Sequence, residues 1–196
     1  MIRPLIAITL LVSAPAWAKS AAQPRQSALD LGKAQYDRGR FARSLELFGQ
    51  AVAQETSASD RNQAYYYQGL ALFELGLYYS AYTSFRNVLL TADAGNKGIY
   101  DKAIRNTVLI TDKLNMVDRI GKALNDLPNG FISPGASAHA NYAIGTYFFS
   151  QGDDRKAASH LKSVHPESPF YSKALFLLGV VATREKNYSE AISNFG

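Results

Sequence analysis

Few residues in this 196-residue chain have the types and spacing that enzyme chemistry requires. Its three histidines could serve as metal ligands or general bases, but His160 and His165 are five residues apart and would not share one helical face. The chain has no cysteine and no H-E-x-x-H pattern to complete a metal site. The histidines are therefore predicted to have structural or surface roles.

Two further stretches have part of a catalytic pattern. The sequence GASAH at residues 135–139 has the first glycine and the serine of a nucleophile elbow, but it lacks the second glycine and a preceding strand. Asp153 and Asp154 stand where a helix is expected to begin, and carboxylates there cap the helix and favour its dipole. No glycine-rich phosphate loop is present. We therefore predict that the protein is not an enzyme and has no metal site and no cofactor.

The composition is that of a globular protein. Hydrophobic residues make up 47% of the chain and charged residues 19%, which is too apolar for a disordered chain. The net charge is +5, but the lysines and arginines are scattered rather than gathered with aromatic residues into a stripe. Such a stripe is typical of nucleic-acid binding, so no nucleic-acid partner is expected.

The N-terminal residues have the pattern of an export signal. Arg3 precedes a short apolar run at residues 5–12, and Ala16-Trp17-Ala18 forms a small-x-small cleavage site. The apolar run is much shorter than the roughly 20 residues that span a bilayer, although an uncleaved N-terminal anchor is the alternative. We expect cleavage after Ala18, a periplasmic or secreted location, and no transmembrane helix in the mature chain. Without cysteines, packing alone must stabilise the exported fold.

Four segments of the chain share one pattern. Each has a leading glycine, and these glycines are about 34–38 residues apart, with one doubled interval that leaves room for a divergent copy. The shared positions are Gly32, Ala34, Tyr36, Gly39, Phe41, Ser44, Phe48 and Ala51 in the first copy, and Gly69, Ala71, Phe73, Gly76, Tyr78, Ala81, Phe85 and Val88 in the second. Shorter matches begin at Gly145 and Gly179.

This pattern resembles the tetratricopeptide repeat, a helix–turn–helix unit of about 34 residues. The resemblance implies an all-α fold, a right-handed α-solenoid of about five helix pairs with a divergent third pair and a truncated fifth. We expect a signal peptide at 1–18, a flexible N-terminus at 19–26, the first two repeats at 27–91, a divergent pair and loop at 92–135, and repeats four and five at 136–196.

Local signals agree with this organisation. Gly39, Gly76 and Gly152 stand where a first helix should end, because glycine adopts the left-handed conformation at little cost. Ser168 and Pro169 are predicted to cap and begin a helix. The small leading residues let paired helices approach closely, while Phe48, Phe85 and Phe195 are expected to fill the space between repeats. Residues 127–135 are expected to form a loop.

Three adjacent tyrosines in the second repeat point in different directions on a helix. An isolated amphipathic helix buries one face, whereas a helix in a stacked array contacts its partner helix, a neighbouring repeat and the groove. We expect Tyr65 to pack on its partner helix, Tyr66 to face the groove, and Tyr67 to lie toward a neighbouring repeat or the rim.

In proteins resembling this one, partners bind a concave groove lined by the first helix of each repeat. Carrying the repeat register over places these residues there: Leu29, Lys33, Tyr36, Tyr66, Leu70, Phe73, Tyr142, Thr146, Phe149, Phe176, Val180 and Arg184. Some of these rings could instead belong to the core between repeats. The lysine and asparagine pairs that hold a carboxylate tail in some cytosolic relatives are absent from the groove positions.

The last expected helix has an apolar stripe, Tyr188, Ala191, Ile192 and Phe195, with no later residues to cover it. We expect that the natural protein is longer or that a partner covers this end.

The resemblance implies a non-enzymatic scaffold of the bacterial cell envelope that binds a protein or peptide partner in an aromatic-lined groove. An adaptor domain of a longer exported enzyme, with its catalytic part beyond residue 196, is the alternative. A purely structural spacer is another, although the aromatic lining counts against it.

Overall fold

The computed structural model describes residues 27–54, 57–91, 97–125, 127 and 130–196, and each regular element in these ranges is an α-helix. The helices are α1 (Ala28–Asp37), α2 (Phe41–Gln54), α3 (Ala58–Glu74), α4 (Tyr78–Leu90), α5 (Lys97–Lys113), α6 (Asp118–Asn125), α7 (Pro134–Ser150), α8 (Asp154–Lys162), α9 (Tyr171–Arg184) and α10 (Tyr188–Phe195). The predicted signal peptide and flexible N-terminus lie outside the described residues.

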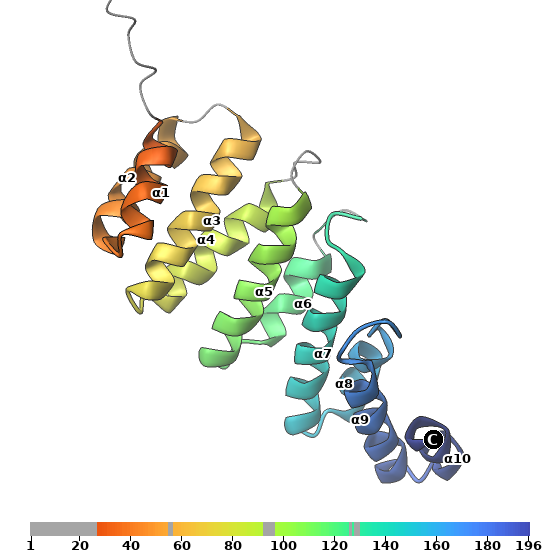
Figure 1. Ribbon diagram of the computed structural model, residues 1–196. Coiled ribbons are helices and arrows are strands. Elements are labelled where there is room, and N and C mark those ends of the chain that lie inside the picture. Colours follow the sequence, from red (N-terminus) through yellow and green to blue (C-terminus); the bar gives the residue numbers. More distant parts are fainter. Residues whose placement is uncertain (1–26, 55–56, 92–96, 126, 128–129) are drawn as a thin grey trace, which may run out of the picture.

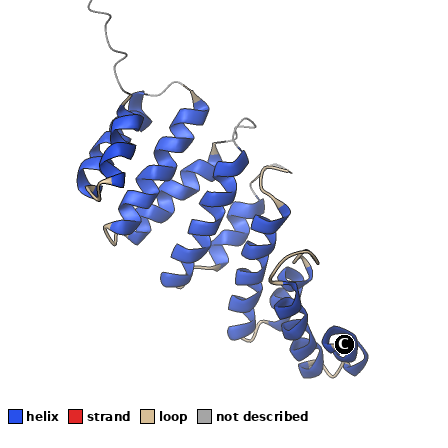
Figure 2. Cartoon of the chain, in the orientation of Figure 1, coloured by secondary structure: helices blue, strands red, loops and turns tan. Residues whose placement is uncertain are grey.

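The helices form five consecutive pairs stacked in an elongated array (Figures 1 and 2). The two helices of a pair pack against each other, and the first helix of each pair also contacts the first helix of the next, from α1 to α9. This arrangement confirms the predicted all-α solenoid of about five helix pairs. Among the described helices, none is both long and apolar enough to cross a bilayer.

The leading glycines stand where the two helices of a pair cross. A Cβ atom at Gly32 would lie 2.5 Å from the Phe48 ring, and one at Gly69 would lie 2.7 Å from the Phe85 ring. Phe48 and Phe85 are fully buried, as predicted for residues that fill the space between repeats. Phe195 stands at the same place against Gly179 but is 52% exposed, so the same prediction is wrong for Phe195.

The turns between paired helices have one backbone conformation. Gly39, Gly76 and Gly152 have φ values of 71°, 74° and 76°, which confirms their predicted role in ending the first helix. In the last pair Lys186 takes this place with φ of 60°, a conformation that is strained for a residue with a Cβ. The turn geometry is therefore conserved between pairs even where the glycine is not.

The helix N-termini correct two sequence-based expectations. Ser27, Ser57 and Ser133 cap helices through their hydroxyl groups, and α7 begins at Pro134, so the predicted loop ends before residue 135. The prediction that Ser168 and Pro169 begin a helix is wrong, because α9 begins at Tyr171. The Ser168 hydroxyl instead accepts a hydrogen bond from the Phe170 amide at 3.2 Å, within a turn that precedes the helix.

The divergent third pair is fixed to the second pair by a buried polar cluster. The Asn62 amide on α3 donates to the Thr91 carbonyl at 3.1 Å and to the Tyr100 hydroxyl of α5 at 3.2 Å. The Tyr100 hydroxyl also donates to the Thr91 carbonyl. Around this cluster lies the largest apolar core of the described chain, formed by α3 to α7. The third pair is therefore held by its own contacts rather than by the repeat's glycine.

Candidate functional site

The helices α1, α3, α5, α7 and α9 follow one another along one face of the array, which we call the first-helix face (Figure 1). The predicted groove residues come from four of these helices. Most of them are half-buried: Lys33, Tyr36, Tyr66, Leu70, Phe73, Tyr142, Thr146, Phe149 and Val180. Phe176 and Arg184 are exposed, whereas Leu29 is only 5% exposed and offers little surface to a partner.

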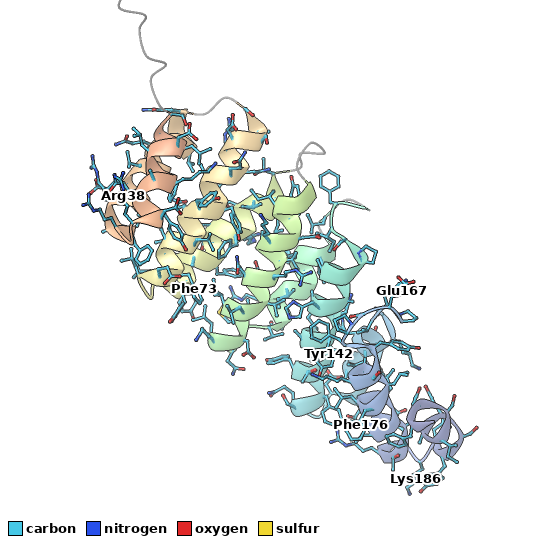
Figure 3. The ribbon with its side chains drawn as sticks, in the orientation of Figure 1. Arg38, Phe73, Tyr142, Glu167, Phe176 and Lys186 are labelled. Carbon is cyan, nitrogen blue, oxygen red and sulfur yellow. The ribbon has the colours of Figure 1, made fainter. Side chains whose placement is uncertain are left out.

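These residues do not form a single cluster. Figure 3 shows Phe73, Tyr142 and Phe176 at successive places along the array, on α3, α7 and α9. Their neighbours must therefore be considered separately for each part of the face. The question at each place is whether the side chain is engaged within the protein or remains open to a partner.

At the N-terminal part, side chains of the predicted groove connect the first two pairs. The Tyr67 ring stacks on Phe48 with 5.7 Å between centroids and meets the Tyr36 ring edge-on at 6.3 Å. The Lys33 ammonium lies 5.1 Å from the centre of the Tyr67 ring and donates to the Gln63 side chain at 2.9 Å. Tyr67 thus lies against a neighbouring repeat, and the surrounding groove positions are largely engaged within the protein.

Tyr66 connects the second and third pairs. Its hydroxyl accepts a hydrogen bond from the Asn106 amide of α5 at 3.2 Å, and its ring centroid lies 5.6 Å from that of Phe85. Burial raises the pKa of the Tyr66 hydroxyl, while the Asn106 hydrogen bond opposes the rise. The hydroxyl is therefore neutral at physiological pH and holds α5 against α3.

A similar link joins the last two pairs. The Arg184 guanidinium lies 4.3 Å from the centre of the Phe149 ring and forms an ion pair with Asp154 at 2.8 Å. Phe176 contacts Phe195 with 5.9 Å between ring centroids. Of the two aromatic groove residues at this end, Phe149 and Phe176, only Phe176 is largely exposed.

Between α5 and α7 the first-helix face has a pocket of about 460 Å³, which we call the α5–α7 pocket. Its lining residues are Val108, Leu109, Asp112, Asn115, Val117, His139, Tyr142, Ala143, Thr146, Tyr147, Ser150 and Phe170. Two predicted groove residues, Tyr142 and Thr146, are among them. Leu109 is 47% exposed, which leaves apolar surface open at this pocket.

A stack of three aromatic rings forms one wall of the α5–α7 pocket. Phe170, just before α9, stacks on both His139 and Tyr142 of α7, with ring centroids 4.9 Å and 5.1 Å apart and nearly parallel planes. Sequence reasoning missed His139 and Phe170 as binding residues. His139 is three residues before Tyr142 on the same helical face, a spacing that could have identified it, whereas Phe170 lies outside the helices and carries no periodic signal.

The electrostatics of His139 indicate a neutral imidazole. Burial lowers the pKa of His139, and the nearby positive charge of Arg105 lowers it further. Its Nδ1 atom is buried and has no hydrogen-bond partner among the described residues. A neutral, stacked ring of this kind suits the binding of an apolar or aromatic side chain.

A second, larger cavity of about 1050 Å³ lies on the other side of α7, between α5, α6 and α8. Its polar groups are paired with each other: Asp101 accepts from the Ser133 amide at 2.7 Å, and His160 bonds to the Asn141 side chain at 3.0 Å. In the part of the chain that the structure describes, no three potential metal ligands come together. The α5–α7 pocket, with its open apolar surface, is therefore the better candidate for binding.

Comparison with known proteins agrees with the repeat architecture. The tetratricopeptide repeat family matches residues 29–97, which cover the first two helix pairs. Among solved structures, YrrB, described as a TPR protein with an unusual peptide-binding site, has 17% identity and a TM-score of 0.54, with 93% of this chain and 90% of that chain covered.

Two structures of MamA have the same fold. MamA from Desulfovibrio magneticus RS-1, residues 41 to the end, has 18% identity and a TM-score of 0.54, with 86% of this chain and 89% of that chain covered. A double mutant of MamA RS-1 has 19% identity and a TM-score of 0.56, with coverage of 86% and 88%. No curated protein matches the sequence significantly.

Proposed function

We propose that this chain, whose first two helix pairs match the tetratricopeptide repeat family, acts as a scaffold that binds a segment of a partner protein on its first-helix face. The anchor of this segment is the α5–α7 pocket, which receives an apolar or aromatic side chain of the partner. The observation that carries the proposal is the ring stack of His139, Phe170 and Tyr142 beside the exposed Leu109.

The physical basis is that rigid aromatic rings provide a large contact area at little entropic cost. Stacking of Phe170 on His139 and Tyr142 holds the rings in place before a partner arrives, so little ordering is required on binding. Aromatic side chains that are already ordered beside a pocket are typical binding hot spots. The peptide-binding site named for YrrB, which has the same fold, supports a peptide as the class of ligand.

The setting of this function is proposed from the N-terminal pattern alone. The charged start, the short apolar run and the small-x-small site at Ala16–Ala18 favour export of the protein to the cell envelope. Its partner would then be a protein of the envelope. The aromatic positions outside the pocket, such as Phe176, extend the surface along which such a segment could lie.

Selection from a random peptide display library against the purified protein tests this proposal. We expect enriched peptides that share an apolar or aromatic residue. Tyr142→Ala removes one ring of the stack and should weaken the binding of a selected peptide by about thirtyfold, the loss typical of a hot spot. The measurement is isothermal titration of the wild-type protein and the variant.

Tyr79→Ala is the matched control, because Tyr79 is an exposed tyrosine of α4 and does not line the pocket. It should leave peptide affinity unchanged. Equal binding by the Tyr142→Ala variant and the wild-type protein, with both folded, would contradict the proposal. A failure to enrich any peptide would contradict it as well.

A further inference from the structure

The second helices α4 and α6 lie behind α3 and α5 and form part of the opposite face of the array (Figure 1). A cleft of about 360 Å³ opens between them. It is lined by Tyr82 and Arg86 of α4 and by Arg119, Lys122 and Ala123 of α6, and we call it the basic cleft. No residue of the α5–α7 pocket takes part in it.

The charges of the basic cleft are not neutralised within the described chain. Its three cations form no ion pair there, in contrast to Lys162, which pairs with Glu190 at 2.9 Å on the outer side of the last pairs. Asp118 is the one acidic residue of α4 and α6, and it does not line the cleft. Three unpaired positive charges around one concavity attract an anionic partner.

Exposed apolar residues of α4 adjoin the same surface. Tyr79 is 64% exposed and Leu90 is 52% exposed. Tyr79, Arg86 and Leu90 share one helical face, because they are seven and four residues apart. This outer face therefore combines large apolar side chains with a cation.

The repeat itself does not require these residues. In the register of the first copy, α2 has Ala42, Gly49 and Ala53 at the places of Tyr79, Arg86 and Leu90. The residues of α2 are too small to present an apolar surface. Packing of α4 within the array therefore does not require large apolar residues on its outer face. Exposed apolar residues that packing does not require are typical of a binding surface.

We propose that the outer face of α4 and the basic cleft bind an anionic lipid membrane surface. The three cations would contact lipid phosphates, while Tyr79 and Leu90 enter the interface between headgroups and acyl chains. An acidic protein segment would match the cations but would not require the exposed apolar residues beside them. The inference goes beyond the proposed peptide-binding function and does not depend on it.

Cosedimentation of the purified protein with lipid vesicles tests the proposal. We expect binding to vesicles of phosphatidylcholine mixed with phosphatidylglycerol, weak binding to phosphatidylcholine alone, and a decrease at high salt. Each cation near an anionic surface contributes about fivefold in affinity, so Arg86→Glu with Arg119→Glu should weaken binding by at least a factor of about 25, or about 1.9 kcal/mol. Both residues are exposed, and circular dichroism should show unchanged helical structure.

Two further variants make the test specific. Arg38→Glu with Lys173→Glu changes the net charge equally at exposed sites on other helices and should have little effect on vesicle binding. Tyr79→Ser with Leu90→Ser keeps every charge of the basic cleft and should still weaken binding severalfold, because apolar area no longer enters the interface.

Three results would overturn the proposal. Equal binding to neutral and anionic vesicles, or none to either, would exclude an anionic membrane partner. An equal loss in the control variant would show that net charge alone is responsible. If inorganic phosphate or polyglutamate displaced the protein from vesicles through the same cations, while Tyr79→Ser with Leu90→Ser had no effect, the cleft would be a site for a soluble anion or an acidic protein.

Discussion

At the scale of single residues, two half-buried histidine rings stay neutral, His139 at the α5–α7 pocket and His160 at the larger cavity on the other side of α7. Burial lowers the pKa of both His139 and His160 below the ordinary histidine value of 6.5. His139 stacks on Phe170, and His160 stacks on Phe148 with ring centroids 6.1 Å apart. Protonation of either ring would place a positive charge among aromatic and apolar groups.

This arrangement predicts a loss of stability in mild acid. In the unfolded chain both histidines gain protons as the pH falls through about 6.5, whereas in the folded protein they do so only at lower pH. The unfolding free energy should therefore fall between pH 7.5 and 5.5. Urea denaturation at these two pH values measures it, and the double variant His139→Phe with His160→Gln should show a weaker pH dependence. An unfolding free energy that rises toward pH 5.5 would contradict the predicted direction of the pH dependence.

At the scale of helices, close approach within a pair depends on glycine at the crossing. A Cβ atom at Gly69 would lie 2.7 Å from the buried ring of Phe85, whereas nothing lies within 4 Å of a Cβ atom at Gly49 on α2. The two glycines are both helical, so they share the same gain in helix propensity on substitution and differ in packing.

Gly69→Ala and Gly49→Ala should therefore change stability in opposite directions. The first overpacks a helix crossing and should cost about 1–3 kcal/mol, while the second should stabilise the protein by about 0.5–1 kcal/mol. Thermal and chemical unfolding measure both values. Hydrogen exchange on Gly69→Ala should lose protection mainly in α1 to α6, since each pair of a solenoid contacts only its neighbours. A uniform loss across all helices would argue against this local coupling.

The last turn offers a second test at this scale. Lys186 has φ of 60° at the place where Gly152 has φ of 76° in the preceding pair. Lys186→Gly removes the steric cost of a Cβ in this conformation and should stabilise the protein by about 1 kcal/mol. Gly152→Ala is the reciprocal control and should destabilise it by a similar amount. Unfolding midpoints in urea that moved the same way for both variants would contradict a shared turn conformation.

At the scale of the whole molecule, the array presents two different surfaces. The first-helix face has the α5–α7 pocket, and the opposite face has the basic cleft with the exposed residues of α4. A scaffold with both surfaces could hold a protein partner on one face while the other contacts a membrane. The Tyr142→Ala variant should retain vesicle binding, and Arg86→Glu with Arg119→Glu should retain peptide binding.

Export of the protein is a prediction for the whole chain. Expressed with its own N-terminus in a bacterium, the protein should be found in the periplasm or medium and begin at Lys19. N-terminal sequencing of the purified protein checks this, and replacing Leu10 and Leu11 by aspartate in the apolar run should block export. Recovery of folded protein from the periplasm with Met1 intact would contradict the predicted cleavage.

The sequence alone determined the helix pairs and their turns, because these depend on residues close together in the chain. Gly69 and Phe85 occupy fixed places within one repeat, and Gly39, Gly76 and Gly152 each end a helix through their own backbone conformation. The start of α9 was harder to predict from the sequence, since Ser168 and Pro169 suit both a helix N-terminus and the turn in which they are found. Local preference allowed both structures there, and packing selected one.

Only the tertiary structure decided which groove residues remain open to a partner. Tyr66 and Tyr142 hold the same place in their repeats, yet Tyr66 bonds to Asn106 of α5, whereas Tyr142 stacks on Phe170 beside a pocket. The difference arises from α5 and from the segment before α9, neither of which follows the repeat pattern. Periodicity specifies how a helix packs within its own pair, but the gap between pairs depends on side chains that are distant in sequence. The α5–α7 pocket and the basic cleft both lie in such gaps.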